Sequence, residues 1–122
     1  MTHAIAIVKR MIAGWESLDP KAVAACFLPD GVWHNMPYPP TEGRDRIETA
    51  AAGFLGAMAT CRFEILNMAE IAPGTVVTER VDIFGKPGAP ELHLPVMGIF
   101  ELEESGIRVW RDYFDSAPFA AA

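Results

Sequence analysis

Hydrophobic residues recur at helical spacing in the first part of the chain. Ile5, Val8, Ile12 and Trp15 fall on one stripe, which predicts an amphipathic helix. The stretch LDPKAVAACF predicts a second helix, because Asp19 is a favourable N-cap and is followed directly by a proline, which suits the first helical position. Two helices are therefore expected before any strand.

The middle of the chain predicts a turn, a strand, a loop and a third helix. PDG at 29–31 predicts a turn and VWHNM at 32–36 a short strand, and the prolines and glycine of PYPPTEGRD at 37–45 indicate a loop. The segment from about residue 45 to 58 predicts a helix. It is Ala-rich and apolar on most faces, so we expect it to be buried.

From residue 61 onward the pattern has the period of β-strands. We expect strands at 61–72, 75–84, 91–102 and around IRVWRDYFD, separated by the turn signals PG, GKPGAP and ESG. Helices followed by a meander of strands predict one α+β domain over residues 1–122, with the N-terminal helices on one face of an antiparallel sheet. A strongly curved sheet with helices over its concave face would form a cone around an apolar pocket. The strand at 91–102 alternates cleanly and places five hydrophobic residues on one side: Leu92, Leu94, Val96, Phe100 and Leu102.

The composition narrows the class of protein. The 122 residues carry a formal net charge of −6 with a pI of about 4.9, which disfavours a nucleic-acid partner because such proteins normally present a basic patch. The longest apolar run, AAAGFLGAMA, is too short to span a bilayer, and the N-terminus lacks the pattern of a secretion signal. We therefore expect a cytoplasmic protein that does not enter a membrane. Cys26 and Cys61 have no metal-ligand spacing and are expected to be free, buried thiols.

Two groups of polar residues interrupt apolar strands. In VWRDYFD, Asp112 shares a strand face with Trp110 and Phe114, although a buried charge is costly unless it is paired. In VVTERVDIF, Arg80 and Asp82 are two residues apart and so project from one face. Taken alone, the first group is typical of a structural carboxylate and the second of an ion pair on a solvated strand face.

A third group lies in WHNMP, where Trp33 and Asn35 share one face; an asparagine at this position is also typical of the start of a turn. If the three groups converge in one pocket, an arginine between two carboxylates lets the pair retain one proton, so that one aspartate is a base and the other an acid. Asn35 could then orient a water molecule with its neutral amide. This is the equipment for removing a proton from water while donating one to a leaving oxygen.

The signatures of several other chemistries are missing from these 122 residues. The sequence has no HExxH, Cys/His cluster, glycine-rich phosphate loop or G-x-S-x-G elbow. His3, His34 and His93 are scattered, and each is expected at the surface or at a strand edge. We therefore expect neither a metal nor a cofactor.

The blocks NMPYPPTEGRD, TERVDIF and VWRDYFD together resemble the limonene-1,2-epoxide hydrolase family, within the SnoaL-like and NTF2-like (cystatin-like) cone folds related to nuclear transport factor 2 and ketosteroid isomerase. Their order and spacing agree with that family from about residue 30 onward. The resemblance implies a curved, mainly antiparallel mixed sheet and a homodimer. It also implies hydrolysis of a small apolar epoxide to a vicinal diol in one step, without a covalent intermediate, metal or cofactor.

The resemblance also implies a role for each candidate residue. Asp112 activates the water and Asn35 holds it; Asp82 protonates the epoxide oxygen, and Arg80 bridges the two aspartates. The family usually has a tyrosine two residues before the asparagine, where this chain has Trp33. An indole N–H donates a hydrogen bond but cannot accept one. Trp33 is therefore expected either to hold the water from another angle, to favour small substrates by filling the pocket, or to leave the water poorly placed.

Other functions fit the same pocket. A ketosteroid-isomerase-like or polyketide-cyclase-like enzyme also needs a carboxylate base in an apolar cone, and a non-catalytic carrier of a small apolar ligand needs only the cone. In each case the expected pocket wall consists of Phe54, Met58, Phe84, Leu94, Val96 and Phe114. The exterior face of the sheet is apolar enough to predict contact with a second subunit through Met97, Ile99, Val109 and Tyr113.

Overall fold

In the computed structural model, which describes residues 2–120, helix α1 (His3–Glu16) begins where the Ile5 backbone N–H donates to Thr2 Oγ1 at 3.1 Å. This bond satisfies one of the N–H groups that a helix leaves free at its start. The apolar stripe of α1 packs into the core, and its Val8 and Met11 side chains are fully buried. The helix predicted from the first hydrophobic stripe is therefore confirmed.

Helix α2 (Pro20–Ala25) starts as the sequence predicts, with Asp19 Oδ1 accepting from the backbone N–H of Ala22 at 3.1 Å. Helix α3 (Arg44–Leu55) packs against α2, and the expectation that α3 is buried on most faces is wrong. Only one stripe of the described helix is buried, made of Ile47, Ala51 and Leu55. Alanine contributes little apolar area, so a helix can be Ala-rich and still leave most of its faces to solvent.

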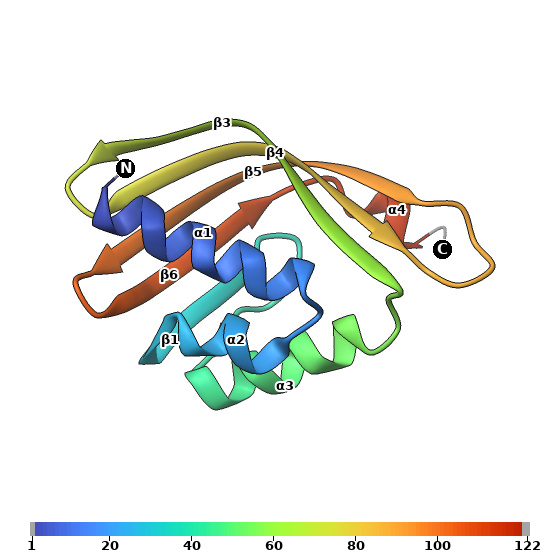
Figure 1. Cartoon of the computed structure of the whole chain (residues 1–122), viewed down its shortest axis with the longest axis horizontal. Coiled ribbons are helices and arrows are strands. Elements are labelled where there is room, and N and C mark those ends of the chain that lie inside the picture. The colour runs from blue at the N-terminus through green and yellow to red at the C-terminus, as the bar shows by residue number, and fades with distance from the viewer. Residues whose placement is uncertain (1, 121–122) are drawn as a thin grey trace.

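The six strands form one sheet in the order β2-β1-β6-β5-β4-β3 (Figure 1). Strands β1 and β6 pair in parallel and all the other neighbours are antiparallel, so the sheet is mixed and the α+β prediction is confirmed. A short helix, α4 (Ala117–Ala120), follows the last strand. The strands are β1 (Phe27–Asn35), β2 (Thr41–Glu42), β3 (Thr60–Ala72), β4 (Thr75–Gly85), β5 (Leu92–Glu103) and β6 (Gly106–Tyr113).

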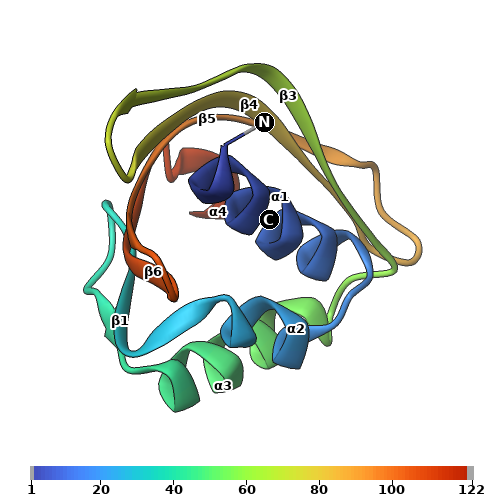
Figure 2. The same cartoon turned by 60° about the vertical axis from the view of Figure 1, so that its left-hand side comes forward.

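The sheet bends strongly around helix α1, which lies in its concavity, while α2 and α3 close the side nearest β1 (Figure 2). Irregular register accompanies the bending, because β3 slips against β4 between Ile65 and Asn67 and again between Glu70 and Ala72. Extra residues of this kind bend a strand and increase its twist. The core therefore fills the concave side, as the cone prediction requires.

The prediction of a turn at PDG is wrong. Pro29, Asp30 and Gly31 lie within β1, where the register against β6 shifts between Phe27 and Val32. A proline has no N–H to donate to a neighbouring strand, and an irregular stretch of a strand tolerates this because its regular hydrogen bonds are already interrupted. The strand that carries the candidate asparagine is consequently longer than predicted.

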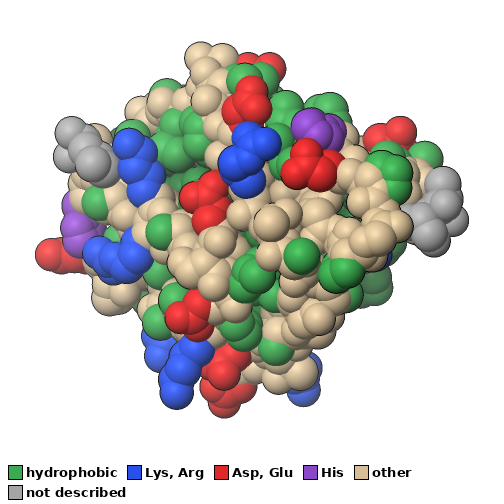
Figure 3. Space-filling view, turned by 45° about the vertical axis from the view of Figure 1, so that its right-hand side comes forward, with side chains coloured by type: hydrophobic (Ala, Val, Ile, Leu, Met, Phe, Trp, Pro, Cys, Tyr) green, Lys and Arg blue, Asp and Glu red, His purple; other side chains and the backbone are tan. Residues whose placement is uncertain are grey.

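No helix within residues 2–120 combines the length and the apolarity that a membrane crossing needs. On the face shown in Figure 3, acidic, basic and hydrophobic side chains are interspersed. Cys26 and Cys61 are both buried and free, as predicted. Burial raises the pKa of both thiols, that of Cys61 to about 12, so both are neutral at physiological pH.

Candidate active site

The candidate polar residues meet in the middle of the concave face because of the strand register. Asn35 of β1 pairs with Asp112 of β6, Asp112 pairs with Gly98 of β5, and Gly98 pairs with Thr78 of β4. These four residues form one row across four strands. Arg80 lies two positions beyond Thr78 and therefore projects from the same face of the sheet.

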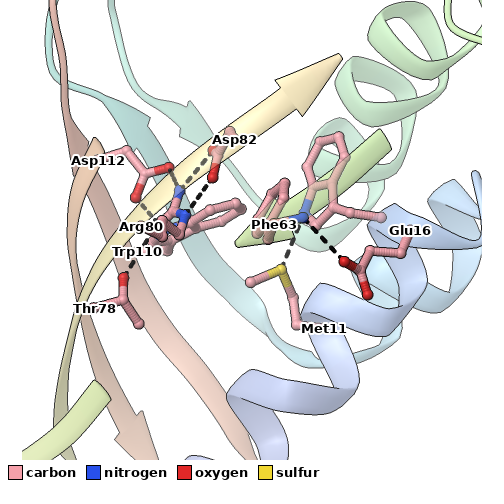
Figure 4. A network of polar contacts seen from close by, with 9 residues as sticks. Met11, Glu16, Phe63, Thr78, Arg80, Asp82, Trp110 and Asp112 are labelled. Carbon is pink, nitrogen blue, oxygen red and sulfur yellow. Dashed lines mark hydrogen bonds and ion pairs between the residues drawn. The ribbon is translucent and has the colours of Figure 1, made fainter. Parts of the chain in front are cut away.

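Arg80 bridges the two aspartates, as predicted (Figure 4). Its Nε and Nη2 donate to Asp82 Oδ1 and Oδ2 at 2.7 and 3.1 Å, Nη2 also donates to Asp112 Oδ2, and Nη1 donates to Thr78 Oγ1 at 2.9 Å. Only 1% of Arg80 and 4% of each aspartate are exposed. The guanidinium thus has acceptors at all three nitrogens, which a buried cation requires.

Gly98 makes this bridge possible. Arg80 on β4 must reach Asp112 on β6 across the intervening strand β5, and the β5 residue of that row is a glycine. A Cβ at Gly98 would lie 2.4 Å from Arg80 Nη1 and 2.5 Å from Asp112 Oδ1, where no side chain fits. The missing side chain therefore leaves the space in which the arginine and the carboxylate meet.

Aromatic rings surround the charged groups on the concave face. Trp110 Nε1 donates to Asp112 Oδ1 at 2.6 Å, so both carboxylate oxygens of Asp112 accept a hydrogen bond. The Arg80 guanidinium carbon lies 4.9 Å from the centre of the Phe63 ring and 5.7 Å from that of Trp110, within the range of cation–π attraction. Trp110 in turn stacks on Trp33, with ring centres 5.5 Å apart.

The charges in this cluster favour retention of one proton by the two carboxyl groups. Burial raises the pKa of Asp82 to about 6, despite the opposing effect of Arg80, and the charge of Asp112 adds to the rise. Burial also raises the pKa of Asp112, against the lowering by Arg80 and by the Trp110 hydrogen bond. Burial would lower the pKa of Arg80, but the two carboxylates hold it above its ordinary value. One cation with one carboxylate and one carboxylic acid is the neutral combination that an apolar site favours.

A cavity of about 60 Å³ lies against this cluster. The predicted residues that line it include Trp33, Asn35, Asp82 and Asp112, whereas Arg80 is not among the lining residues. Five of the six predicted wall residues also line it: Phe54, Phe84, Leu94, Val96 and Phe114.

The sixth predicted wall residue, Met58, is misplaced. Met58 follows the end of α3 and lines an adjoining outer groove instead of the inner cavity. Its position near the end of an Ala-rich segment does not show which of two neighbouring cavities it faces.

Trp33 and Asn35 take up the places that the WHNMP pattern predicts. Asn35 lines the cavity, and its backbone carbonyl accepts from the Tyr38 N–H at 2.8 Å, so it begins a turn as well. The Trp33 Nε1 atom is buried and has no hydrogen-bond acceptor among residues 2–120. An unpaired buried donor costs about 1–3 kcal/mol. Trp33 as a residue lines the cavity.

Several residues of the site have roles that the sequence analysis did not assign. Gly98 interrupts the alternating pattern of its strand, and an isolated glycine in a strand indicates a close approach of other groups. The hydrogen bonds from Trp110 to Asp112 and from Arg80 to Thr78 have no comparable signal in the sequence, because they depend on side-chain orientation. Trp15 and Phe119, which also line the cavity, come from helices α1 and α4, outside the three blocks.

The histidines lie away from the cavity. His3 and His34 each bond a backbone carbonyl through Nε2, and His93 pairs with Glu91 at 3.4 Å. In the described part of the chain, no three His, Cys, Asp or Glu side chains gather into a group that could hold a metal ion.

Solved structures of similar proteins share this fold. The chain is similar to an LEH-like epoxide hydrolase from M. tuberculosis, with 27% identity and a TM-score of 0.83 over 94% of this chain and 84% of that one. A hypothetical protein with a ketosteroid isomerase-like fold from Catenulispora acidiphila, in complex with trimethylamine, has 22% identity and a TM-score of 0.80, covering 89% and 85%. A putative SnoaL-like polyketide cyclase from Shewanella putrefaciens has 16% identity and a TM-score of 0.84, covering 99% and 96%. The last two likenesses show the fold alone.

A family model also matches the sequence. The model, described as a SnoaL-like domain, covers residues 8–111, which is most of the chain and includes Trp33, Asn35, Arg80 and Asp82. Together with the cone geometry, this match confirms the resemblance at the level of the superfamily: the chain belongs to the SnoaL-like domain family.

Proposed function

We propose that this protein hydrolyses an epoxide to a vicinal diol by general acid–base catalysis. The observation that carries the proposal is the buried Asp82–Arg80–Asp112 cluster, which favours one retained proton and borders a small apolar cavity. Such a cluster offers a base and an acid to the same bound molecule. The likeness to an LEH-like epoxide hydrolase supports this choice of reaction.

The strand register supports the assignment of the two roles. Asn35 and Asp112 are direct neighbours on adjacent strands, so a water held by the Asn35 amide lies beside the Asp112 carboxylate. Asp82 is on β4, separated from β6 by strand β5, and so approaches the cavity from another side. Asp112 is therefore the base that removes a proton from water, and Asp82 is the acid that protonates the epoxide oxygen.

The reaction balances without a cofactor. The water oxygen forms a bond to an epoxide carbon as that carbon's bond to the epoxide oxygen breaks, and the water gives one proton to Asp112. Asp82 gives its proton to the departing oxygen, which becomes the second hydroxyl of the diol. Return of the proton from Asp112 to Asp82 restores the starting state.

The environment of the cluster favours this distribution of protons between the two aspartates. Arg80 stabilises whichever aspartate is ionised, so its charge supports both the beginning and the end of the reaction. The Trp33 N–H can donate to a lone pair of the water, while the water donates one proton to Asp112 and the other to the side-chain oxygen of Asn35, Oδ1. One lone pair of the water then remains free to attack carbon.

The test is a single-turnover reaction in oxygen-18 water with enzyme in excess over a panel of epoxides. We expect labelled diol in the first turnover, because the solvent oxygen adds directly to carbon. Unlabelled diol in the first turnover would indicate attack by a carboxylate of the protein instead. An isomerised product without solvent oxygen would favour an isomerase or cyclase.

Two substitutions control this experiment. Asp112→Asn is expected to keep the fold and to abolish diol formation, because an amide cannot take the proton from water. Asp115→Asn is the matched control, since Asp115 is exposed and its Oδ1 only caps the backbone N–H of Ala117. Diol formation by Asp112→Asn at the parent rate would refute the assignment of the base.

We also propose that the protein is a homodimer that associates through the convex face of the sheet. Leu66, Met97 and Tyr113 are each about half exposed on that face, at 51%, 50% and 49%. Met97 and Tyr113 are direct neighbours on β5 and β6, and Ile99 and Val109 extend the apolar surface. Light scattering at micromolar concentration is expected to give the mass of a dimer, and Met97→Glu that of a monomer. A parent protein that is monomeric would contradict the proposal.

A further inference from the structure

The inner cavity adjoins a larger groove, and the two share three lining residues. The inner cavity measures about 60 Å³ and the outer groove about 560 Å³. Three phenylalanines line both: Phe54 of α3, Phe84 of β4 and Phe119 of α4. We call these three residues the phenylalanine partition.

The two cavities differ in chemistry as well as in size. Both aspartates and Asn35 line the inner cavity, and none of them lines the outer groove. The inner cavity has room for only a few water molecules, given that one water needs about 10–15 Å³ measured in this way. The outer groove has the volume of a typical small-molecule site. A compact molecule of terpene size cannot place all of its atoms beside the aspartates.

The phenylalanine partition is built from packed but separate elements. The Phe54 and Phe84 rings meet edge to face with their centres 4.9 Å apart, and Phe119 meets Phe114 in the same way at 5.9 Å. Phe54 and Phe119 are each only partly buried. An apolar chain that passes between these rings would exchange contacts with water for contacts with aromatic carbon.

We propose that the substrate spans both cavities, with its epoxide in the inner cavity and an unbranched apolar chain that crosses the phenylalanine partition into the outer groove. This inference rests on the proposed function and narrows its substrate to elongated epoxides with the oxirane at or near one end. The wall of the outer groove beyond the phenylalanine partition includes Ala57, Met58 and Leu92, which suit a hydrocarbon chain.

The first test measures kcat/KM for unbranched terminal epoxides of four to twelve carbons. We expect kcat/KM to rise with chain length once the chain reaches the outer groove, by up to about fourfold for each methylene buried. Ala57→Trp is expected to fill the outer groove and to lower kcat/KM at least tenfold more for the long epoxides than for the four-carbon epoxide. Ala52→Trp is the matched control, because Ala52 is an exposed residue of the adjacent helix α3 and does not line either cavity.

A second test does not depend on hydrolysis. Isothermal titration calorimetry measures the heat of binding directly, so the additional tryptophan of each variant does not affect the signal. Titration with unbranched terminal diols is expected to give a Kd that falls with chain length in the parent and in Ala52→Trp, but not in Ala57→Trp. This outcome supports the two-cavity inference even if no epoxide is hydrolysed, in which case the proposed function alone fails.

A third variant tests the phenylalanine partition itself. Phe119→Ala removes one of its side chains without altering the aspartate cluster, so epoxides branched next to the oxirane are expected to gain in kcat/KM relative to unbranched ones. Hydrolysis or diol binding that is independent of chain length, or that Ala57→Trp changes equally for short and long chains, would overturn the inference.

Discussion

Replacement of Gly98 by alanine tests the geometry of the buried cluster most directly. The new Cβ would lie 2.4 Å from Arg80 Nη1, 2.5 Å from Asp112 Oδ1 and 2.9 Å from Thr78 Oγ1, whereas ordinary contact begins near 3.4 Å. The arginine and the carboxylate must therefore move by about 1 Å, or the backbone of β5 must shift. Neither movement is easy, because these side chains are buried and bonded to each other.

The expected cost of Gly98→Ala has two parts. Overpacking of a well-filled core costs about 1–3 kcal/mol. Separation of Arg80 from Asp112 would add the penalty of breaking a buried ion pair, about 3–5 kcal/mol when a partner is lost outright and less when it is displaced. We therefore expect the free energy of unfolding to fall by roughly 2–4 kcal/mol. A 1 Å misplacement of catalytic groups also commonly costs about 100-fold in rate.

Urea denaturation and the pH dependence of kcat/KM together measure these effects. Displacement of Arg80 removes its lowering influence on the carboxyl pKa values, so we expect the pH dependence to move to higher pH in addition to the loss of stability. Gly53→Ala is the control for stability, because a Cβ at Gly53, an exposed position of α3, meets nothing within 4 Å. A Gly98→Ala protein as stable as the parent, with an unchanged pH profile, would show that the missing side chain at Gly98 is not needed for Arg80 to meet Asp112.

Three further predictions follow from the same cluster. Folding raises the pKa of Asp82 from about 3.8 to about 6, so the native state binds more protons than the unfolded state between these two pH values. The protonated form of Asp82 therefore stabilises the fold fully below pH 3.8, and this contribution is lost as the pH rises through 6. Relative to Asp82→Asn, the parent should therefore lose about 2 kcal/mol between pH 4 and pH 7 in urea denaturation, and parallel pH profiles would contradict the raised pKa. Thr78→Val keeps the shape but leaves an Arg80 N–H without its acceptor, and we expect a loss of about 1–3 kcal/mol on denaturation; no loss would mean that the hydrogen bond contributes nothing. Trp33→Phe removes a donor that has no acceptor among residues 2–120 while keeping a ring against Trp110, so we expect stability within about 1 kcal/mol of the parent and at least a tenfold lower kcat. A parent-like kcat would show that the N–H does not hold the water.

The sequence predicts the elements of this fold well, because strands and helices leave different periods in it. The two-residue alternation correctly places Arg80 and Asp82 on one face of β4, and Trp110 and Asp112 on one face of β6. Capping chemistry correctly locates the start of α2 at Asp19. These features are local, so each can be deduced from a single segment.

Features that depend on how distant segments pack together are harder to predict from the sequence. The register that aligns Asp112 with Gly98 and Asn35 is a property of three strands, and no single strand encodes it. PDG is typical of a turn, yet tertiary pairing with β6 keeps these residues in β1. Likewise, whether Met58 faces the inner cavity or the outer groove depends on the phenylalanine partition, to which distant segments contribute. The resemblance of three sequence blocks brings the site residues together where the pattern alone cannot.

The cost of burying charge itself determines which proton the site holds. With both aspartates ionised, Arg80 would leave one negative charge uncompensated in a cavity lined by aromatic and aliphatic carbon, so the pair retains a proton. The retained proton is also the one that an epoxide oxygen needs when its bond to carbon breaks. In the proposed reaction the cluster gains one proton from water at Asp112 and gives one from Asp82 to the substrate, so its total charge is unchanged. Arg80 Nη2 donates to both carboxyl groups. The network that makes burial of the site tolerable thus also supplies its acid, and a more polar, water-filled cavity would weaken both effects together.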